Sequence, residues 1–158
     1  IFEWNKINKN IKLLILTKDT EDATQILNSW AQLFKSFIII KSASYNQVPN
    51  YLAKASAAIF FIKPSFSKIA SSPTKMAECW SMNLPIITNS GIGDNDYFIK
   101  NENGGVLINA FNSAEYQKAY NHYLQLKDKK INYRNIALKH FDNAIAINLY
   151  TQVYNKLS

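Results

Sequence analysis

Cysteine, histidine and long apolar runs are scarce in this chain, and each scarcity excludes a class of structure or site. The single cysteine, Cys79, cannot form an internal disulfide, which fits a reducing compartment. The two histidines, His122 and His140, lack metal-ligand spacing, and we expect no metal and no cofactor. No apolar run approaches the roughly 18–20 residues of a membrane span, and no secretory signal pattern opens the chain.

Basic residues outnumber acidic ones by 18 to 11, which gives a net charge of +7. A basic surface can serve nucleotides, an anionic membrane or nucleic acid, or it can simply be solvated. The lysines are scattered and the aromatic residues fall at spacings typical of a core, so we expect no nucleic-acid partner. With 158 residues, 47% of them hydrophobic, the chain is large enough for a single domain with a core.

Short apolar runs alternate with helical patterns along the whole chain. Each run is typical of a buried parallel strand; the runs cover residues 11–16, 37–40, 57–62, 85–88 and 106–108. Helical spacing or capping residues mark the segments 20–34, 49–55, 72–82, 95–101, 112–127, 129–140 and 141–157. The alternation predicts an α/β, Rossmann-like fold over residues 1–158, with a parallel sheet covered by helices on both faces.

Loops that follow parallel strands gather at one rim of such a sheet, where ligands bind. Four loops of this kind are expected, at residues 17–18, 42–45 with Tyr45, 63–72 and 89–94. All four glycines lie between residues 91 and 105, within Gly91-Ile92-Gly93-Asp94 and Gly104-Gly105. Such a concentration predicts special backbone conformations or close backbone approach, although two ordinary turns would give the same pattern.

The most informative segment of the rim is Ser72-Pro73-Thr74-Lys75, with Glu78 one helical turn further on. Ser72 is a good helix N-cap, and Pro73 suits the first helical position. The free N–H groups of Thr74 and Lys75 could hold a phosphate at the positive end of the helix dipole. Glu78 shares their face and can accept hydrogen bonds from sugar hydroxyls. The pattern indicates a nucleotide site; the alternative is an ordinary capped helix whose Glu78 pairs with Lys75.

The order and spacing of these segments resemble the C-terminal, donor-binding domain of family 4 (group 1) glycosyltransferases, which have the GT-B fold. The likeness covers nearly the whole chain, from Lys12 to Leu157. The matching pieces are Val48-Pro49-Asn50-Tyr51-Leu52, the 72–78 helix start, Asn83-Leu84-Pro85-Ile86-Ile87, Gly91-Ile92-Gly93-Asp94, Asn103-Gly104-Gly105-Val106-Leu107-Ile108, Phe141 and the Tyr150…Val153-Tyr154 end.

The resemblance implies a transfer, with retention, of a sugar from a nucleoside diphosphate sugar to a carbohydrate or glycolipid acceptor. Glu78 would hydrogen-bond the donor ribose, and Pro73, Thr74 and Lys75, with Ser72 before them, would lie against the diphosphate. The base or sugar would lie near Tyr45, Gly91, Gly93 and Asp94. The resemblance assigns no catalytic residue. It implies a cytoplasmic enzyme of polysaccharide biosynthesis, and peripheral contact with the inner membrane surface would suit the surplus lysines.

The departures from the family pattern concern the sugar and the extent of the chain. The family often has two glutamates, and Ala70 stands where the first would be, beside the donor sugar. Ser72-Pro73-Thr74 replaces a common Gly-Phe-Gly segment. The acceptor domain is absent, as are the first donor-domain strand and the loop after it, which usually carries an Arg and a Lys. We therefore interpret the chain as part of a larger enzyme and expect residues 1–158 alone to be inactive.

Two other functions fit the predicted architecture less well. A sugar-nucleotide epimerase of the same GT-B fold would need acids and a histidine in the cleft, and neither histidine follows a predicted strand. A receiver-like or nucleotide-binding regulatory domain is the non-enzyme alternative. A receiver would need acids after the first strand and an Asp after the third. Thr17 and Lys63-Pro64 stand there instead.

Overall fold

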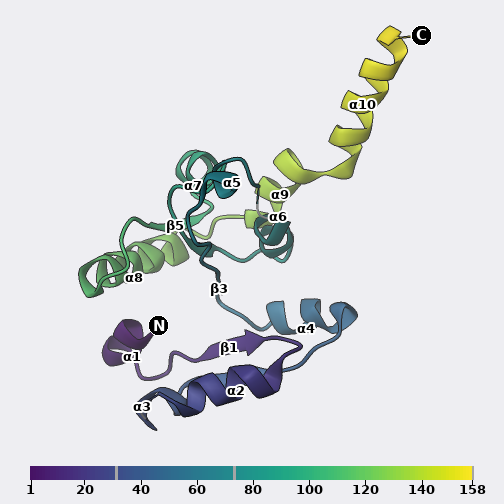
Figure 1. The fold of residues 1–158 in the computed structure, drawn as a ribbon. Coiled ribbons are helices and arrows are strands. Elements are labelled where there is room, and N and C mark those ends of the chain that lie inside the picture. The colour runs from purple at the N-terminus through teal and green to yellow at the C-terminus, as the bar shows by residue number, and fades with distance from the viewer. Residues whose placement is uncertain (31, 73, 158) are drawn as a thin grey trace.

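The computed structural model describes residues 1–30, 32–72 and 74–157 and has an α/β fold (Figure 1). The strands of the described residues are β1 (Leu13–Leu16), β2 (Ile38–Lys41), β3 (Ala58–Ile59), β4 (Ile86–Asn89) and β5 (Gly105–Ile108). Every strand pair is parallel, as the sequence predicts. The strands form two sheets, one with the order β1-β2 and one with the order β3-β4-β5.

Helices precede, connect and follow these strands. They are α1 (Phe2–Ile7), α2 (Thr20–Asn28), α3 (Gln32–Lys35), the 3₁₀ helix η1 (Tyr45–Gln47), α4 (Val48–Leu52), α5 (Phe66–Ile69), α6 (Thr74–Ser81), α7 (Asn95–Glu102), α8 (Ser113–Asp128), α9 (Tyr133–Phe141) and α10 (Asn143–Leu157). None of the described helices combines the length and the apolar character needed to cross a membrane.

The three-stranded sheet has a hydrophobic core on each face, because successive side chains of a strand point to opposite sides. Ile86 contributes to one core, together with Met76 and Trp80 of α6. Its neighbour Ile87 contributes to the other, together with Leu126 of α8. All five of these side chains are buried. The prediction of helices on both faces is therefore confirmed for this sheet.

Trp80 links α6 to the start of β5. Its indole Nε1 donates a hydrogen bond of 2.7 Å to the carbonyl oxygen of Gly104. A Cβ on Gly104 would lie 2.2 Å from the Trp80 ring, so only glycine allows the ring to lie this close. The predicted close backbone approach at this glycine pair is confirmed.

Two of the predicted helix ends are also present. The Asn112 side chain caps α8 by accepting the N–H of Glu115 at 2.9 Å. Asn83 ends α6 in the left-handed region, with φ of 60°, and the N–H of Leu84 donates to the carbonyl oxygen of Cys79 at 3.0 Å. This is the bond pattern of a helix closed by a left-handed residue.

Two predicted helix bounds and one predicted loop need correction. The helix expected over residues 20–34 stops at Asn28, where the Ser29 hydroxyl bonds the Ile26 carbonyl oxygen at 2.6 Å and competes with the helical pattern. The helix expected from residue 129 begins at Tyr133 because Lys130 has a positive φ of 49°. A short helix, α5, lies in the Ser- and Lys-rich segment that reads as a loop.

Two strand predictions also need correction. The run 57–62 forms a ladder only at Ala58–Ile59. Further on, the Asn89 side chain replaces strand pairing: it accepts the N–H of Ile62 at 2.8 Å and donates to the Ile62 carbonyl oxygen at 3.0 Å. The run 11–16 is not a buried strand, since no residue of β1 is buried and Leu14 is 37% exposed.

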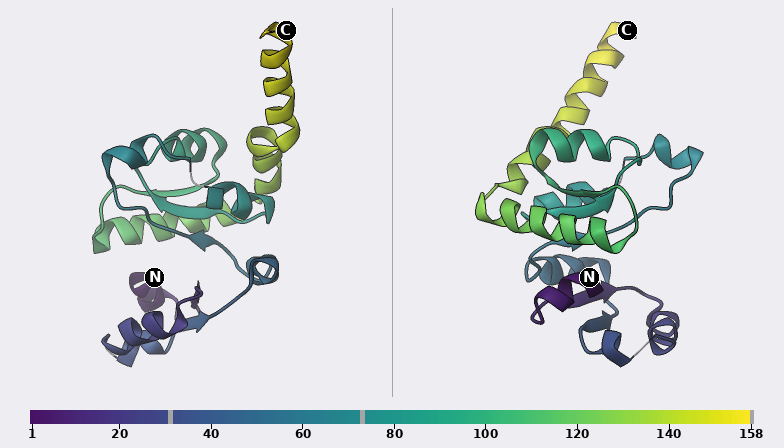
Figure 2. Two further views of the ribbon diagram at one scale, coloured as in Figure 1. Left: turned by 45° about the vertical axis from the view of Figure 1, so that its right-hand side comes forward. Right: turned by 90° about the vertical axis from the view of Figure 1, so that its left-hand side faces the viewer.

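The C-terminal helix α10 extends away from the rest of the molecule (Figures 1 and 2). No residue of this helix is buried. Its exposed apolar side chains include Ile145, Leu149, Val153 and Leu157, which recur every four residues along one side. The fold that positions the candidate site therefore lies within the sheets and the helices before α10.

Candidate functional site

The loops that follow β3 and β4 meet at the carboxyl ends of these two neighbouring strands. The N–H of Gly93 donates to the carbonyl oxygen of Lys68 in α5 at 3.1 Å. The Ser71 hydroxyl donates to the same Lys68 oxygen at 2.9 Å. The structure thus brings the glycine loop and the segment before α6 together, as the strand order predicts.

Gly93 makes this approach possible. Its φ is +44°, and a Cβ at this position would lie 1.6 Å from the carbonyl oxygen of Ser71. Gly91 also has a positive φ, +78°, but a Cβ there would meet no atom within 4 Å. The special backbone conformation is therefore present at both glycines, and the close backbone approach is at Gly93.

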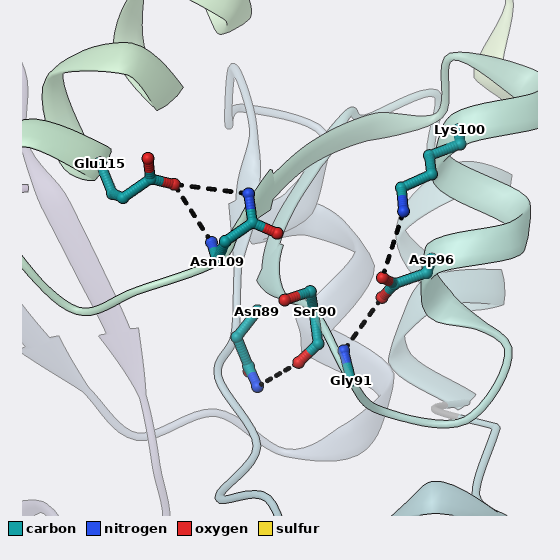
Figure 3. A network of polar contacts seen from close by, with 7 residues as sticks. All are labelled: Asn89, Ser90, Gly91, Asp96, Lys100, Asn109 and Glu115. Atoms are coloured by element: carbon teal, nitrogen blue, oxygen red, sulfur yellow. Dashed lines mark hydrogen bonds and ion pairs between the residues drawn. The ribbon is translucent and has the colours of Figure 1, made fainter.

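The other end of the glycine loop is tied to α7 (Figure 3). The N–H of Gly91 donates to Asp96 Oδ1 at 3.1 Å, and Asp96 Oδ2 lies 3.5 Å from the ammonium of Lys100. At the end of β4, the Asn89 amide donates to the carbonyl oxygen of Ser90 at 3.2 Å. The loop is held by backbone and side-chain bonds on both sides.

Three of the predicted donor-binding residues, Thr74, Lys75 and Glu78, lie on the first turns of α6. Thr74, Lys75 and Glu78 are exposed, and the structure gives none of these three side chains a hydrogen bond or an ion pair with another described residue. The alternative, in which Glu78 only forms an ion pair with Lys75, is therefore not supported, because no such ion pair is present among the described residues. Ser72 is also exposed, whereas Pro73, and with it the proposed proline start of the helix, lies outside the described residues.

Cations dominate the segment that leads into α6. Lys63, Lys68 and Lys75 are all exposed, and residues 63–75 contain no acid. Serine and threonine hydroxyls alternate with these lysines, at positions 65, 67, 71, 72 and 74. The segment therefore presents positive charge and hydrogen-bond donors, and Glu78 follows as an acceptor one turn into the helix.

Buried polar atoms without partners lie in β4 and at the start of α7, on either side of the glycine loop. Among the described residues, Thr88 Oγ1, Asp94 Oδ1 and both amide atoms of Asn95 are buried and make no hydrogen bond. Thr88 and Asn95 are fully buried. A buried polar group without a partner costs stability, and such groups are enriched where a ligand or ordered water completes the structure.

The sequence pattern did not indicate Thr88 or Asn95 as candidates. A usable signal existed, because Thr88 and Asn89 are polar residues at the end of an otherwise apolar run. Their burial depends on how α7 packs on the sheet, against β5, and the sequence pattern does not show this packing.

Cys79 has no chemical role at this site. Burial raises the pKa of its thiol to about 11, the carboxylate of Glu78 acts in the same direction, and Lys75 opposes it. The thiol is therefore protonated at neutral pH and packs in the core beside Trp80.

Tyr45 is not brought to this site by any described contact. It lies in η1, after β2 of the two-stranded sheet, and 80% of its surface is exposed. The base-binding role of Tyr45 stays a prediction, and no described contact joins Tyr45 to the glycine loop.

Both histidines belong to helices rather than to the loops after the strands. His122 lies on α8, and His140 lies on α9 with its Nε2 2.7 Å from Glu102 Oε1. Within the described residues, no group of three or more His, Cys, Asp or Glu side chains is arranged to hold a metal ion.

Comparisons with known proteins give no relative for this chain. No family model matches it, and neither the curated proteins nor the solved structures contain a significant match.

Proposed function

We propose that this chain is the donor-binding domain of a glycosyltransferase and that it binds a nucleoside diphosphate sugar between the start of α6 and the Gly91–Asp94 loop. The observation that carries the proposal is the free, exposed set of Thr74, Lys75 and Glu78 on the first turns of α6. Donors for a phosphate stand one turn before an acceptor for sugar hydroxyls, which is the order a nucleotide presents.

The chemistry of transfer gives Lys75 and the helix start a role beyond binding. Negative charge builds on the nucleoside diphosphate as it leaves the sugar, and positioned cations and N–H dipoles stabilise that charge. Lys75 and the N–H groups at the start of α6 would supply this stabilisation. Glu78 would accept hydrogen bonds from the ribose hydroxyls of the donor and so hold the diphosphate close to the start of α6.

Two supports come from the surroundings of the helix. Thr88 and Asn95 carry unpartnered polar atoms at the two ends of the glycine loop, and because both side chains are fully buried, a donor would reach them only after the loop moves. The resemblance to the donor domain of family 4 glycosyltransferases assigns the donor to Thr74, Lys75 and Glu78 as well. Ala70, exposed at the end of α5, leaves the group beside the donor sugar unassigned, and the acceptor would bind to a domain outside this chain.

The test is a titration of the natural full-length protein, by NMR or thermal shift, with a panel of nucleoside diphosphate sugars. We expect at least one of them to bind. Lys75→Ala and Glu78→Gln should each weaken that binding at least tenfold, about 1.4 kcal/mol. Lys127→Ala and Asp128→Asn, which change exposed charges at the far end of α8, should leave the affinity unchanged. Binding that is equal in all four variants would refute the site.

Residues 1–158 by themselves should bind the donor but not transfer its sugar, because the acceptor side of the cleft would be missing. The measurement is product formation by the purified chain with the donor that binds best, compared with the full-length enzyme. Appreciable transfer by the 158-residue chain would contradict the proposal that a separate domain binds the acceptor.

A further inference from the structure

The last strand, β5, pairs with β4 on one side and has an open edge on the other. The described residues leave such edges on β1, β2, β3 and β5. Natural sheets usually protect an edge with a charge, a proline or a very short strand. Lys12 directly precedes β1, Lys41 ends β2, and β3 has only two residues. Residues 103–109, which contain β5, have neither a charge nor a proline, so the β5 edge is the least protected of the four.

The hydrogen bonds to β4 show which backbone groups of β5 lie on this edge. The N–H of Ile86 donates to the carbonyl oxygen of Gly104 at 3.3 Å. In a parallel pair, alternate residues direct their N–H and C=O groups to the same neighbour. Gly105 and Leu107 therefore direct their backbone groups away from β4, to the open edge.

The next N–H along this edge already has a partner, and that partner is a carboxylate. The N–H of Asn109 donates to Glu115 Oε2 at 3.3 Å, as Figure 3 shows. The other oxygen of Glu115 lies 2.9 Å from the ammonium of Lys118. Glu115 therefore closes the edge at the carboxyl end of β5 and leaves Gly105 and Leu107 open before it.

A cavity of about 300 Å³ lies at the open part of the edge. Its lining comes from β5, the end of α7 and the middle of α8, and consists of Ile99, Lys100, Asn103, Gly105, Leu107 and His122. No acid is among these residues. The ion pair of Lys100 with Asp96 is 3.5 Å long, and the Lys100 side chain is 67% exposed. Exposed pairs of this kind contribute little, so the ammonium remains available to a ligand.

The helices on both faces of β5 limit what can enter this cavity. Val106 packs with α8 on one face, and Leu107 packs on the core that includes Ile99 of α7 on the other. Gly105 is buried although it lies on an edge. A second copy of this chain would bring its own α7 and α8 against these helices, and the net charge of +7 on each copy would oppose the approach. A single extended segment without flanking helices avoids the first obstacle, and an acidic one avoids the second.

We infer that the edge of β5 binds an extended acidic segment of another protein as an added strand. The carbonyl oxygens of the segment would accept the N–H groups of Gly105 and Leu107, and its own N–H groups would donate to their carbonyl oxygens. An acidic side chain of the segment would lie at the amino end of the edge, beside Lys100 and His122. At the other end it would meet the carboxylate of Glu115, so charge sets the register of the segment.

Titration with a pair of blocked peptides tests the inference. The probe is acetyl-Thr-Val-Glu-Val-Thr-amide, and the matched peptide has lysine in place of glutamate. Each is added to the natural full-length protein carrying isotope-labelled glycine and leucine, and the NMR signals of the Gly105 and Leu107 amides are followed. The glutamate peptide should shift both signals with a Kd in the millimolar range, and the lysine peptide should bind roughly fivefold more weakly or less. Unshifted signals at both amides with about 10 mM glutamate peptide would overturn the inference.

Two variants separate the backbone contact from the charge. Leu107→Pro removes an N–H on the open edge and leaves the bonds to β4 in place, and it should weaken binding of the glutamate peptide roughly fivefold or more. Lys100→Glu should reverse the preference between the two peptides, a result that mere loss of folding does not give. Lys9→Glu, a change of an exposed lysine before β1, is the charge-matched control and should keep the wild-type preference.

Two outcomes would contradict the acidic occupant. An unchanged preference in Lys100→Glu would show that the cations of the cavity do not contact the segment. Shifts of the Gly105 and Leu107 signals that grow with protein concentration in the absence of peptide would assign the edge to a second copy of the chain.

Discussion

The carbonyl oxygen of Ser71 occupies the space in which a side chain on Gly93 would stand. A Cβ on Gly93 would lie 1.6 Å from that oxygen, far inside contact distance. The residues on the two sides of this contact belong to different strand–helix loops, the one before α6 and the one before α7. The absence of a side chain at Gly93 therefore sets how closely the two halves of the candidate site approach each other.

Replacing Gly93 by alanine should destabilise the protein by about 2 kcal/mol or more, because the loop must move in addition to adopting an unfavourable φ. Gly91→Ala is the matched control. It has the positive φ without the clash, so about 1 kcal/mol is expected. The measurement is urea unfolding of both variants and the wild type. Equal losses would mean that the Ser71 contact contributes nothing.

The fully buried amide of Asn95 separates stability from function. Both of its polar atoms are without a partner among the described residues, so Asn95→Leu should leave the free energy of unfolding unchanged or raise it. If the amide serves the ligand, the same change should weaken nucleotide-sugar binding at least tenfold. Urea unfolding should therefore show an unchanged or higher free energy of unfolding, while titration with the donor should show a lower affinity.

Asn89→Leu is the control for that experiment. The Asn89 amide bonds both backbone groups of Ile62 and the Ser90 carbonyl oxygen, so its loss leaves partly buried backbone groups unpaired and should cost about 1 kcal/mol or more. A loss of stability in Asn95→Leu as large as in Asn89→Leu would show that the Asn95 amide has a structural partner.

The thiol of Cys79 should resist modification in the native protein. A pKa of about 11, against an ordinary value of 9.0, lowers the thiolate fraction near neutral pH by about 100-fold. Burial of the side chain, which is 6% exposed, slows the reaction further. Iodoacetamide labelling in buffer and in denaturing urea measures the difference, and comparable rates in the two conditions would contradict the buried, protonated state.

The sequence predicted those parts of the fold that depend on neighbouring residues. The Asn112 cap and the left-handed Asn83 are local, since the capping side chain and the residues it serves lie within a few positions. The parallel strands follow from alternation of apolar runs and helical segments. These features need only the immediate chain, and the structure has them at the predicted places.

The features that the sequence did not predict depend on partners distant in the chain. The apolar run of β1 has the same pattern whether or not a strand covers its second edge, so the pattern could not show that Leu14 is exposed. β3 is short because a side chain from β4, that of Asn89, pairs with Ile62. Thr88 and Asn95 are predicted at the end of a strand and at the start of a helix, and their burial, which the pattern does not show, comes from the packing of α7 on the sheet.

Acid should weaken the link between α7 and α9, which the carboxylate of Glu102 makes. The ammonium of Lys139 donates to Glu102 Oε1 at 2.7 Å, and His140 Nε2 lies 2.7 Å from the same oxygen. The hydrogen bond from Lys139, followed by the contact with His140, lowers the pKa of Glu102 below its ordinary value of 4.5. The folded state therefore binds the proton more weakly than the unfolded chain does.

The sign of the pH dependence follows from this difference. The stabilisation by Glu102 is fully present above pH 4.5, the ordinary value, and is lost as the pH falls through the lower pKa of the folded state. Glu102→Gln should lower the melting temperature at pH 7 and change it less as the pH approaches 3. Glu21→Gln, which removes a carboxylate without an ion pair among the described residues, should keep the wild-type difference between the two pH values. A Glu102→Gln variant whose melting temperature stays below that of the wild type by the same amount at every pH would show that the link depends on side-chain packing and not on the charge of Glu102.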